Sequence, residues 1–246
     1  MKTSVVISQP MFFPWAGMLE QMRLADVFVH YDDVQFSKGS FTNRVQIKTA
    51  QGSRWLTVPL SGVSLGTAIR DVGIDSRKDW RRTHRETLFQ AYAHAPYRSD
   101  MMAVVEEVYA REEASMSELA IASMMAVHRY FGFPKPVKFH DSSQLGIGGS
   151  GSQRVLDVVR HLDGDLYITG HGARHYLDHE LFERSGVQVE YLDYQRHPYP
   201  QLHGPFDPHV SSLDLIANCG RQGREVLTSP SVPWRQFLAK MAGSAG

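Results

Sequence analysis

The spacing of hydrophobic positions in this chain switches between the periods of strands and helices. Short β-branched or aromatic runs at 4–8 and 27–31 predict strands, and the segment 18–26 between them has helix-forming composition. In a parallel strand–helix–strand unit, the loop after the first strand and the end of the second strand open at the same edge of the sheet. We therefore expect a ligand site where residue 9 faces residues 32–33.

A β-hairpin and a group of helices follow this unit. Polar and apolar residues alternate over 40–48, Gln51-Gly52 forms a turn, and the apolar run 55–60 supplies the second strand. The next expected elements are a short strand at 69–74 and helices at 80–92, 100–111 and 115–130, the last of which stops at Gly132. The helical segment of about 80–131 is thus an insertion in the α/β pattern.

Strands and helices alternate again after residues 134–140. The expected elements are helices at 152–162 and 173–183, strands at 166–169 and 188–194, a short helix that Ser211 and Asp214 open as a capping box, and a tail over 232–246. Such alternation predicts a mostly parallel sheet with flanking helices. We predict one α/β domain over residues 1–246, Rossmann-like or nucleotidyltransferase-like, with the hairpin and the helical segment as additions.

Composition narrows the class of protein. With 246 residues and 42% hydrophobic content, the chain can bury the core of one large domain. Its 26 basic and 26 acidic residues cancel, so we expect no general nucleic-acid or membrane binding, while a local phosphate site stays open. The single cysteine, Cys219, excludes an intrachain disulfide and a cysteine-rich zinc site. No apolar run is long enough for a signal peptide or a membrane span, which predicts a cytoplasmic protein.

Asp32 and Asp33 are the leading candidates for catalysis. Adjacent side chains of a strand point to opposite faces, so one of the two carboxylates is expected to be the active group. Transfer of an acyl group to an amine needs a base, and it needs hydrogen-bond donors for the oxyanion. The donors could come from polar residues close by in sequence: Lys38, Asn43, Arg44 and Lys48. The alternative interpretation is a turn carboxylate paired with Arg44.

Gln9 is the first candidate for substrate binding. Pro10 stiffens the loop after the strand, so the Gln9 amide is held where it can recognise a carbonyl or hydroxyl group. Phe12, Phe13 and Trp15 could form an apolar wall beside it, or they could cap the core, as most aromatic side chains do.

Several motifs are similar to those of a known family. They are Gln9-Pro10, Phe13-Pro14-Trp15, Asp32-Asp33-Val34-Gln35-Phe36, Asn43-Arg44, Ile47-Lys48 and Trp55-Leu56-Thr57-Val58-Pro59, with later matches at Tyr176, Tyr199, Gln201 and Asp214. Together they span nearly the whole chain, which resembles the WbqC-like protein family. The sequence departs from the family pattern at His171 and His175.

The resemblance implies a biosynthetic transferase, since members of this family occur in O-antigen and related sugar gene clusters. The expected reaction moves an aminoacyl group, such as glycyl, or another acyl group to the amine of an amino sugar or related small metabolite. By resemblance the donor is a carrier-protein thioester or an aminoacyl-tRNA, and no cofactor is expected. The resemblance adds further substrate-binding candidates: Gln35, Tyr176, Tyr199 and Gln201.

Three histidines suggest a second kind of site. His171, His175 and His179 recur every four residues and would share a helix face, where two imidazoles can bind one metal ion. The motif lacks a glutamate, and Gly172 makes His171 a loop residue, so solvated or phosphate-facing histidines are the alternative. The Pro-rich segment 195–209 could close over the crevice as a lid or wall.

A glycine-rich loop leaves a nucleotide site open. Glycines at 146, 148, 149 and 151 precede a predicted helix and would let backbone amides approach a phosphate, or they could form a plain connector. The His-x-Gly-His element of nucleotidyltransferases is absent.

The leading hypothesis is a transferase with Asp33 or Asp32 as the base and with Lys38 or Arg44 binding a phosphate or carboxylate. It forms no covalent intermediate, because no Ser or Cys nucleophile motif is visible. The alternatives are a non-catalytic nucleotide-sugar binding module and a nucleotidyl-transferring or metal-dependent enzyme.

Overall fold

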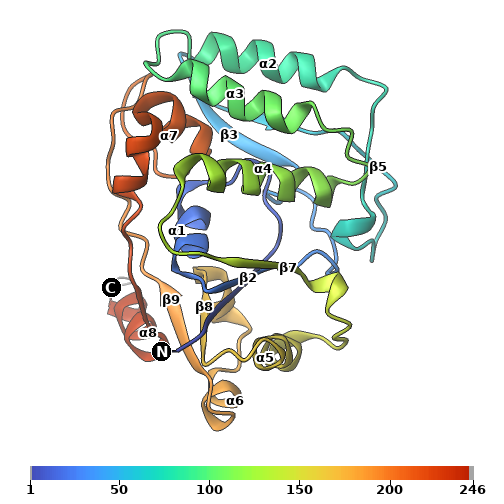
Figure 1. Ribbon diagram of the computed structural model, residues 1–246, viewed down its shortest axis with the longest axis vertical. Helices are drawn as coiled ribbons and strands as arrows, with labels where there is room; N and C mark the ends of the chain where they lie inside the picture. Colours follow the sequence, from blue (N-terminus) through green and yellow to red (C-terminus); the bar gives the residue numbers. More distant parts are fainter. Residues whose placement is uncertain (1, 244–246) are drawn as a thin grey trace.

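A six-stranded sheet forms the middle layer of the computed structural model, which describes residues 2–243 (Figure 1). Its order is β10-β9-β8-β1-β2-β7, and every neighbouring pair is parallel except β9 and β10. The strands are β1 (Ser4–Ser8), β2 (Val27–His30), β7 (Lys138–Asp141), β8 (Leu166–Thr169), β9 (Gln188–Leu192) and β10 (Ser231–Pro233). The predicted α/β class with a mostly parallel sheet is confirmed.

Helices cover both faces of this sheet. Successive strand residues point to opposite faces, so Val6 packs into one core and its neighbours Val5 and Ile7 into the other. The core of Val6 lies beneath α1 (Ala16–Leu24), α4 (Met116–Phe131) and α7 (Ser212–Cys219), with α2 (Trp80–Ala91) and α3 (Arg98–Tyr109) beyond α4 (Figure 1). The other core lies against α5 (Gly151–His161), α6 (His179–Arg184) and α8 (Trp234–Gly243).

The segment between β2 and β7 contains the predicted hairpin and helical insertion. The hairpin is β3 (Arg44–Thr49) and β4 (Gly52–Thr57), followed by the small pair β5 (Leu60–Ser61) and β6 (Gly73–Ile74). A 3-10 turn at Ile69–Asp71 replaces most of the strand expected at 69–74. Gly132 ends α4 as predicted, with the left-handed φ of 59° that a glycine adopts easily.

Helix α4 also holds the loop between β1 and α1. The Ser123 hydroxyl accepts a hydrogen bond from the Phe13 amide at 2.8 Å and donates to the Ala120 carbonyl at 2.7 Å. The Met11 amide contacts the sulfur of Met124 at 3.3 Å. Phe13 has a φ of 42°, which a non-glycine residue adopts only under constraint. The insertion therefore fixes the conformation of the loop that carries Gln9.

Three further local predictions were wrong. The helix expected at 173–183 is broken into a 3-10 turn at His171–His175 and α6, whose start is capped by Asp178. Most of the expected tail forms β10 and α8, because Phe237 is buried against the sheet. Strand β7 begins at Lys138, within the segment 134–140, for which the sequence predicted no element. The capping box lies at Ser115–Glu118 rather than at α7, where Ser211 alone caps the helix.

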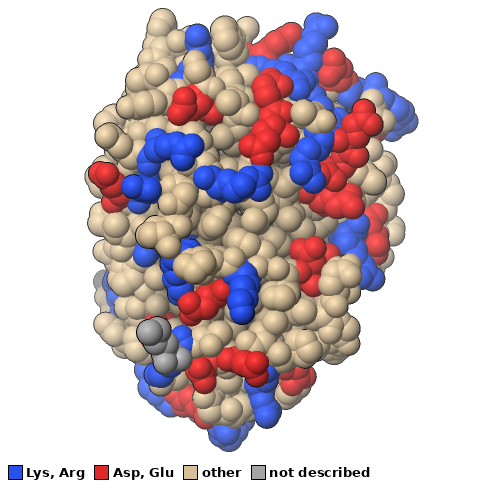
Figure 2. All heavy atoms as spheres, in the orientation of Figure 1, with Lys and Arg blue, Asp and Glu red and all other residues tan. Residues whose placement is uncertain are grey.

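The surface carries mixed charge. On the face shown in Figure 2, lysines and arginines alternate with acidic side chains over α2, α3 and α4, and pairs such as Arg85–Glu106 bridge neighbouring helices. Within residues 2–243, no helix is both long enough and apolar enough to cross a membrane.

Candidate active site

A cavity of about 1060 Å³ opens at the carboxyl edge of the parallel strands. Strand β1 lies between β2 and β8, and the chain continues from β1 to β2 on one side and reaches β8 on the other side only later. The strand order therefore reverses at β1. Open α/β sheets bind ligands in the crevice at such a switch point. The residues that follow these strands line the cavity, among them Gln9 after β1, Asp33 after β2 and Gly170 after β8.

Aromatic residues form one wall. Trp15 lies at the N-terminus of α1 and packs edge-on against Tyr194, with ring centroids 5.0 Å apart. Its indole also covers Gly17, where an added Cβ would lie only 2.2 Å from the ring. Trp15 therefore covers the first turn of α1 and leaves an apolar surface toward the cavity, as expected for a pocket wall. Phe13, in contrast, is fully buried in the core and does not line the cavity.

Asp33 is the cavity carboxylate, and it is paired. It accepts hydrogen bonds from Arg154 at 2.5 Å and from the Ser142 hydroxyl at 2.6 Å. Partial burial acts to raise the pKa of Asp33, but the Ser142 and Arg154 hydrogen bonds outweigh it and hold the pKa below its usual value. Arg154 also lies 4.9 Å from the centre of the Tyr31 ring. An ionised Asp33 orients Arg154 well but is a weak proton acceptor.

Asp32 does not line the cavity and is hydrogen-bonded to the turn after β7. Its carboxylate accepts hydrogen bonds from the Ser143 hydroxyl at 2.7 Å and from the Ser143 amide at 3.0 Å. It also lies 3.0 Å from the Ser142 hydroxyl, whose one hydrogen is shared with Asp33. Only 5% of Asp32 is exposed. It fixes the turn after β7. Because β2 ends at His30, the two aspartates do not alternate across a strand, and both carboxylates approach the Ser142 hydroxyl, while only Asp33 lines the cavity.

The glycine-rich loop forms another side of the cavity. Gly149, Ser150 and Gly151 line it at the start of α5, and both glycines have positive φ, 92° and 61°. Ser150 precedes the helix without capping it, so the first amides of α5 have no side-chain acceptor from this residue. Arg154 lies one turn into the same helix. This side of the cavity therefore offers backbone and guanidinium hydrogen-bond donors to an anionic group.

The three histidines do not come together. His171 lines the cavity, and its Nε2 lies 2.9 Å from the Leu192 carbonyl oxygen. His175 is exposed, while His179 is buried with its Nε2 2.7 Å from the Tyr191 hydroxyl. Across the described chain, no group of three or more His, Cys, Asp or Glu side chains could hold a metal ion. The break between the 3-10 turn and α6 removes the shared helix face on which the metal hypothesis depended.

The polar residues expected beside the carboxylates lie elsewhere, because the hairpin turns away from the strand ends. Lys38 is exposed on a turn, and Asn43 donates to the Val58 carbonyl at 3.0 Å. Arg44 lies 4.2 Å over the ring of Trp55 and donates to the Gly39 carbonyl, so it is not paired with either aspartate. None of the three lines the cavity.

Lys48, Tyr199 and Gln201 belong to a buried network outside the cavity. Lys48 donates to Gln201 Oε1 at 3.1 Å, and Tyr199 donates to Asp214 at 3.0 Å. Tyr92 donates to the other oxygen of Asp214 at 3.0 Å. Burial raises the pKa of Asp214 to about 6. The network ties the Pro-rich segment to the hairpin and α7, so three of the residues expected to bind substrate hold this segment instead.

Gln35 and Tyr176 lie at the mouth of the cavity, where 62% of Tyr176 is exposed. Sequence reasoning missed several lining residues. Tyr31 stands two positions before Asp33, and the others are far from Gln9 and Asp33 along the chain: Arg154, Tyr194, Arg196 and His209. The glycine loop gave a signal for Arg154, since that residue falls in the first turn after it.

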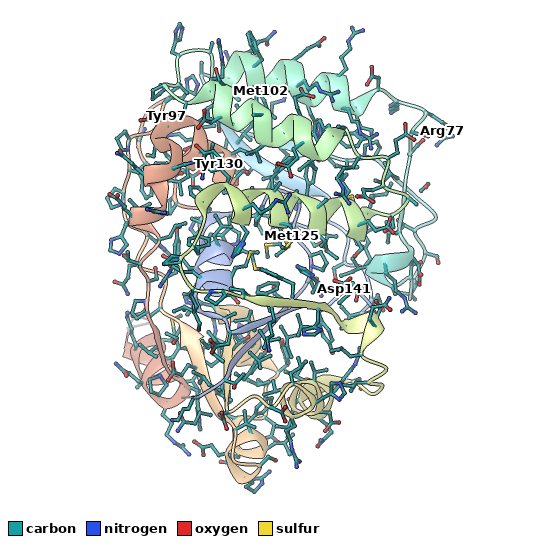
Figure 3. The ribbon with its side chains drawn as sticks, in the orientation of Figure 1. Arg77, Tyr97, Met102, Met125, Tyr130 and Asp141 are labelled. Atoms are coloured by element: carbon teal, nitrogen blue, oxygen red, sulfur yellow. The ribbon has the colours of Figure 1, made fainter. Side chains whose placement is uncertain are left out.

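A smaller hollow of about 390 Å³ lies between α3, α4 and the end of β7. Figure 3 shows Met125 of α4 and Asp141 of β7, which both line it. Its arginines are paired with acidic neighbours, Arg111 with Glu113 and Arg129 with Glu107. The larger cavity is therefore the candidate site.

Comparison with known proteins gives two matches. The model of the WbqC-like protein family matches residues 9–226. A protein of Mycobacterium tuberculosis strain H37Rv, "Uncharacterized protein Rv1507c", is 30% identical over 226 residues, which cover 91% of this chain and 96% of that protein. No solved structure matches. The family match includes both Gln9 and the glycine loop, and so covers the residues around the cavity.

Proposed function

Because this chain belongs to the WbqC-like protein family, we propose that it is a biosynthetic transferase that moves an acyl or aminoacyl group, such as glycyl, to an amine. The acceptor is an amino sugar or a related small metabolite. Both substrates bind in the cavity at the carboxyl edge of the sheet. At about 1060 Å³ this cavity is at the upper end of the range for ligand sites, which supports room for a donor and an acceptor together.

The observation that carries the proposal is the convergence of different chemical groups on one cavity. Gln9 offers an amide for a carbonyl or hydroxyl group, and Arg154 with the start of α5 offers donors to a phosphate or carboxylate. Trp15 and Tyr194 offer an apolar surface for a sugar or an acyl chain. Each substrate of the proposed reaction has one of these features.

Direct transfer in a ternary complex fits the lining of the cavity. Cys219 lies in α7 outside the lining, and burial raises the pKa of its thiol to about 11. A thiol with that pKa is a poor nucleophile at neutral pH. The acyl group therefore passes from the donor to the amine without an intermediate on this cysteine.

A macromolecular donor, either a carrier-protein thioester or an aminoacyl-tRNA, would approach over Phe41. This ring is 39% exposed, lines the cavity and lies 5.7 Å from the ring of Trp55. The pair forms an aromatic strip from the surface to the cavity, along which the arm of a donor could extend.

One observation favours a second candidate, a nucleotide-sugar binding module without catalysis. Asp33 follows the strand next to β1, the position from which an acidic residue binds ribose hydroxyls in dinucleotide-binding folds. The start of α5 would then hold the phosphates. This candidate shares the binding chemistry of the transferase and lacks turnover.

The test is product formation, measured by mass spectrometry. The purified protein is incubated with nucleotide-linked amino sugars as acceptors and with glycyl or acetyl thioesters as donors. The transferase predicts an acceptor that gains the mass of the acyl group and a free thiol in equal amount. Arg154→Met should abolish product, because it removes the guanidinium beside the glycine loop, and Lys38→Met, on the exposed turn, should leave the rate unchanged.

The two candidate functions give different results in this assay. Saturable binding of a nucleotide sugar with no product from any donor, carrier-protein thioesters and aminoacyl-tRNA included, would reject the transferase and favour the binding module. Equal loss of product in Lys38→Met and Arg154→Met would reject the assignment of the reaction to this cavity.

A further inference from the structure

We propose that His171 is the proton acceptor for the attacking amine and that helix α8 holds its ring in place. This inference rests on the proposed transferase function and assigns its base. Asp33, the carboxylate in the cavity, is engaged by Arg154 and Ser142. His171 is a titratable group on the opposite side, in the turn after β8, and it lines the same cavity.

The hydrogen bond to Leu192 decides which ring nitrogen can accept a proton. A carbonyl oxygen only accepts, so His171 Nε2 carries the hydrogen and donates it to the Leu192 carbonyl across 2.9 Å. In the neutral ring Nδ1 then has a free lone pair. Nδ1 makes no hydrogen bond to any of the described residues. It is also not fully buried, so another molecule can reach it. It is the ring atom open to a bound substrate.

The ring is also fixed from behind. Its centroid lies 4.7 Å from that of Phe237 of α8, and Phe237 stacks on Tyr191 of β9 at 4.3 Å with the planes 4° apart. Phe237 is 1% exposed. The sheet, α8 and the Leu192 carbonyl therefore define the position of His171 from two directions, as a general base requires. Phe237 is a positioning residue in this arrangement.

Charged and titratable groups line the same cavity as His171 or lie on the elements next to it. They are Arg174 in its own turn, Tyr31, Asp33 and Arg154 across the cavity, Tyr176 at the mouth, Tyr194, Arg196 and His209 after β9, and the Asp193–Lys240 pair between β9 and α8. Among these groups Asp33 is paired with Arg154, and Asp193 is paired with Lys240.

The step balances without a further reactant. The lone pair of the neutral amine attacks the acyl carbon, the carbon–sulfur or carbon–oxygen bond of the donor breaks, and its electron pair leaves with the sulfur or oxygen. The amine proton passes to His171 Nδ1 and from there to the leaving group. The products are the amide and the free thiol or alcohol, and His171 returns to its neutral form.

The test compares His171→Gln with a matched control, His175→Gln. The glutamine amide can still donate to the Leu192 carbonyl but cannot accept a proton, whereas His175 is an exposed residue of the same turn. We expect kcat of His171→Gln to fall by about 10²-fold or more with little change in KM. The acidic limb of its kcat–pH profile should disappear. His175→Gln should keep the wild-type rate and profile.

A second measurement does not depend on turnover. Long-range ¹H–¹⁵N spectra report which nitrogen of His171 carries the hydrogen, and we expect Nε2. Phe237→Leu should broaden these signals and lower kcat at constant KM. A hydrogen on Nδ1, or a wild-type rate and pH limb in His171→Gln, would overturn the assignment while leaving the transferase intact. No turnover by the wild type with any donor and acceptor would overturn the transferase and this role of His171 together.

Discussion

The adjacent carboxylates at the end of β2 have separate tasks. Asp33 orients Arg154 in the cavity, while Asp32 accepts hydrogen bonds from the turn that follows β7. We expect Asp32→Asn to lower the free energy of unfolding by about 1.5–3 kcal/mol, because it weakens bonds to a buried charged group. Urea denaturation measures this change. Asp33→Asn should cost less stability and weaken ligand binding, and a reversed order of the two effects would contradict the assignment.

His84 makes stability depend on pH. Burial is the main cause that lowers its pKa from 6.5 to about 4, and both ring nitrogens are bonded in the neutral form, to the Thr57 carbonyl and to the Tyr109 hydroxyl. As pH falls below 6.5, His84 is protonated in the unfolded chain but stays neutral in the folded protein until the pH approaches 4. Up to about 3 kcal/mol of stability should therefore be lost between pH 6.5 and 4. Urea midpoints over this range measure the loss, and His84→Gln should show less of it.

Asp214 changes stability with pH in the opposite direction to His84. Its pKa is raised from 3.8 to about 6, mainly by burial, so the folded protein binds this proton first and gains stability as pH falls from 6 to 3.8. This stability is lost again as pH rises through 6. Asp214→Asn should therefore make the acid-induced loss steeper than in the wild type, and an unchanged slope would show that Asp214 is ionised in the fold throughout.

Sequence alone predicted some of the cavity-lining residues from their place just after a strand. Gln9 and Asp33 were found in this way. Arg154 is 121 positions from Asp33, and its role depends on the sheet order that brings α5 beside β2. Lys48 and Gln201 were predicted to bind substrate, but the pleat of β3 points Lys48 into the buried network that contains Gln201. No local sequence pattern reveals that direction.

At the scale of elements, α1 depends on a close approach between its first turn and the residue before it. Gly17→Ala would place a methyl group 2.2 Å from the Trp15 ring. We expect a loss of about 1–3 kcal/mol from overpacking, which exceeds the gain of up to about 1 kcal/mol from helix propensity. Thermal unfolding measures it. Gly148→Ala, where nothing lies within 4 Å, is the control, and equal stability of the two variants would contradict this account.

The elements that the sequence predicted well are those with a strong local pattern. The hairpin, α4 and the first strand–helix–strand unit have periodicity or a stop signal in their own residues. Helix α8 was missed because its packing depends on a contact that is distant in sequence: Phe237 is buried against Tyr191 of β9. The predicted helix at 173–183 failed because Asp178 starts a new helix within it.

At the scale of the whole molecule, the cavity joins the two halves of the sheet. Its lining comes from both sides of the switch point, so a ligand that binds the folded state should raise the stability of the entire domain. At about 100 times the dissociation constant the gain is about 2.7 kcal/mol. For a domain of this size we expect Tm to rise by about 5–10 °C with a nucleotide-linked amino sugar. Differential scanning fluorimetry measures the shift.

Two variants control this prediction. Arg154→Met should remove most of the shift, because it removes the guanidinium that lies with the start of α5 on the proposed anion-binding side of the cavity. Lys38→Met should retain the shift, since Lys38 does not line the cavity. The same shift in both variants would place the ligand outside this cavity.

The anchoring of the Gln9 loop by α4 has a consequence for the design of smaller proteins. Deletion of residues 80–131 would keep every strand of the six-stranded sheet and all of α5, and would still remove Ser123 and Met124, the partners of Phe13 and Met11. Without these partners Phe13 would relax from its left-handed conformation, and Gln9 would lose its fixed place. A minimal scaffold grafted from this fold must therefore carry α4 along with the sheet.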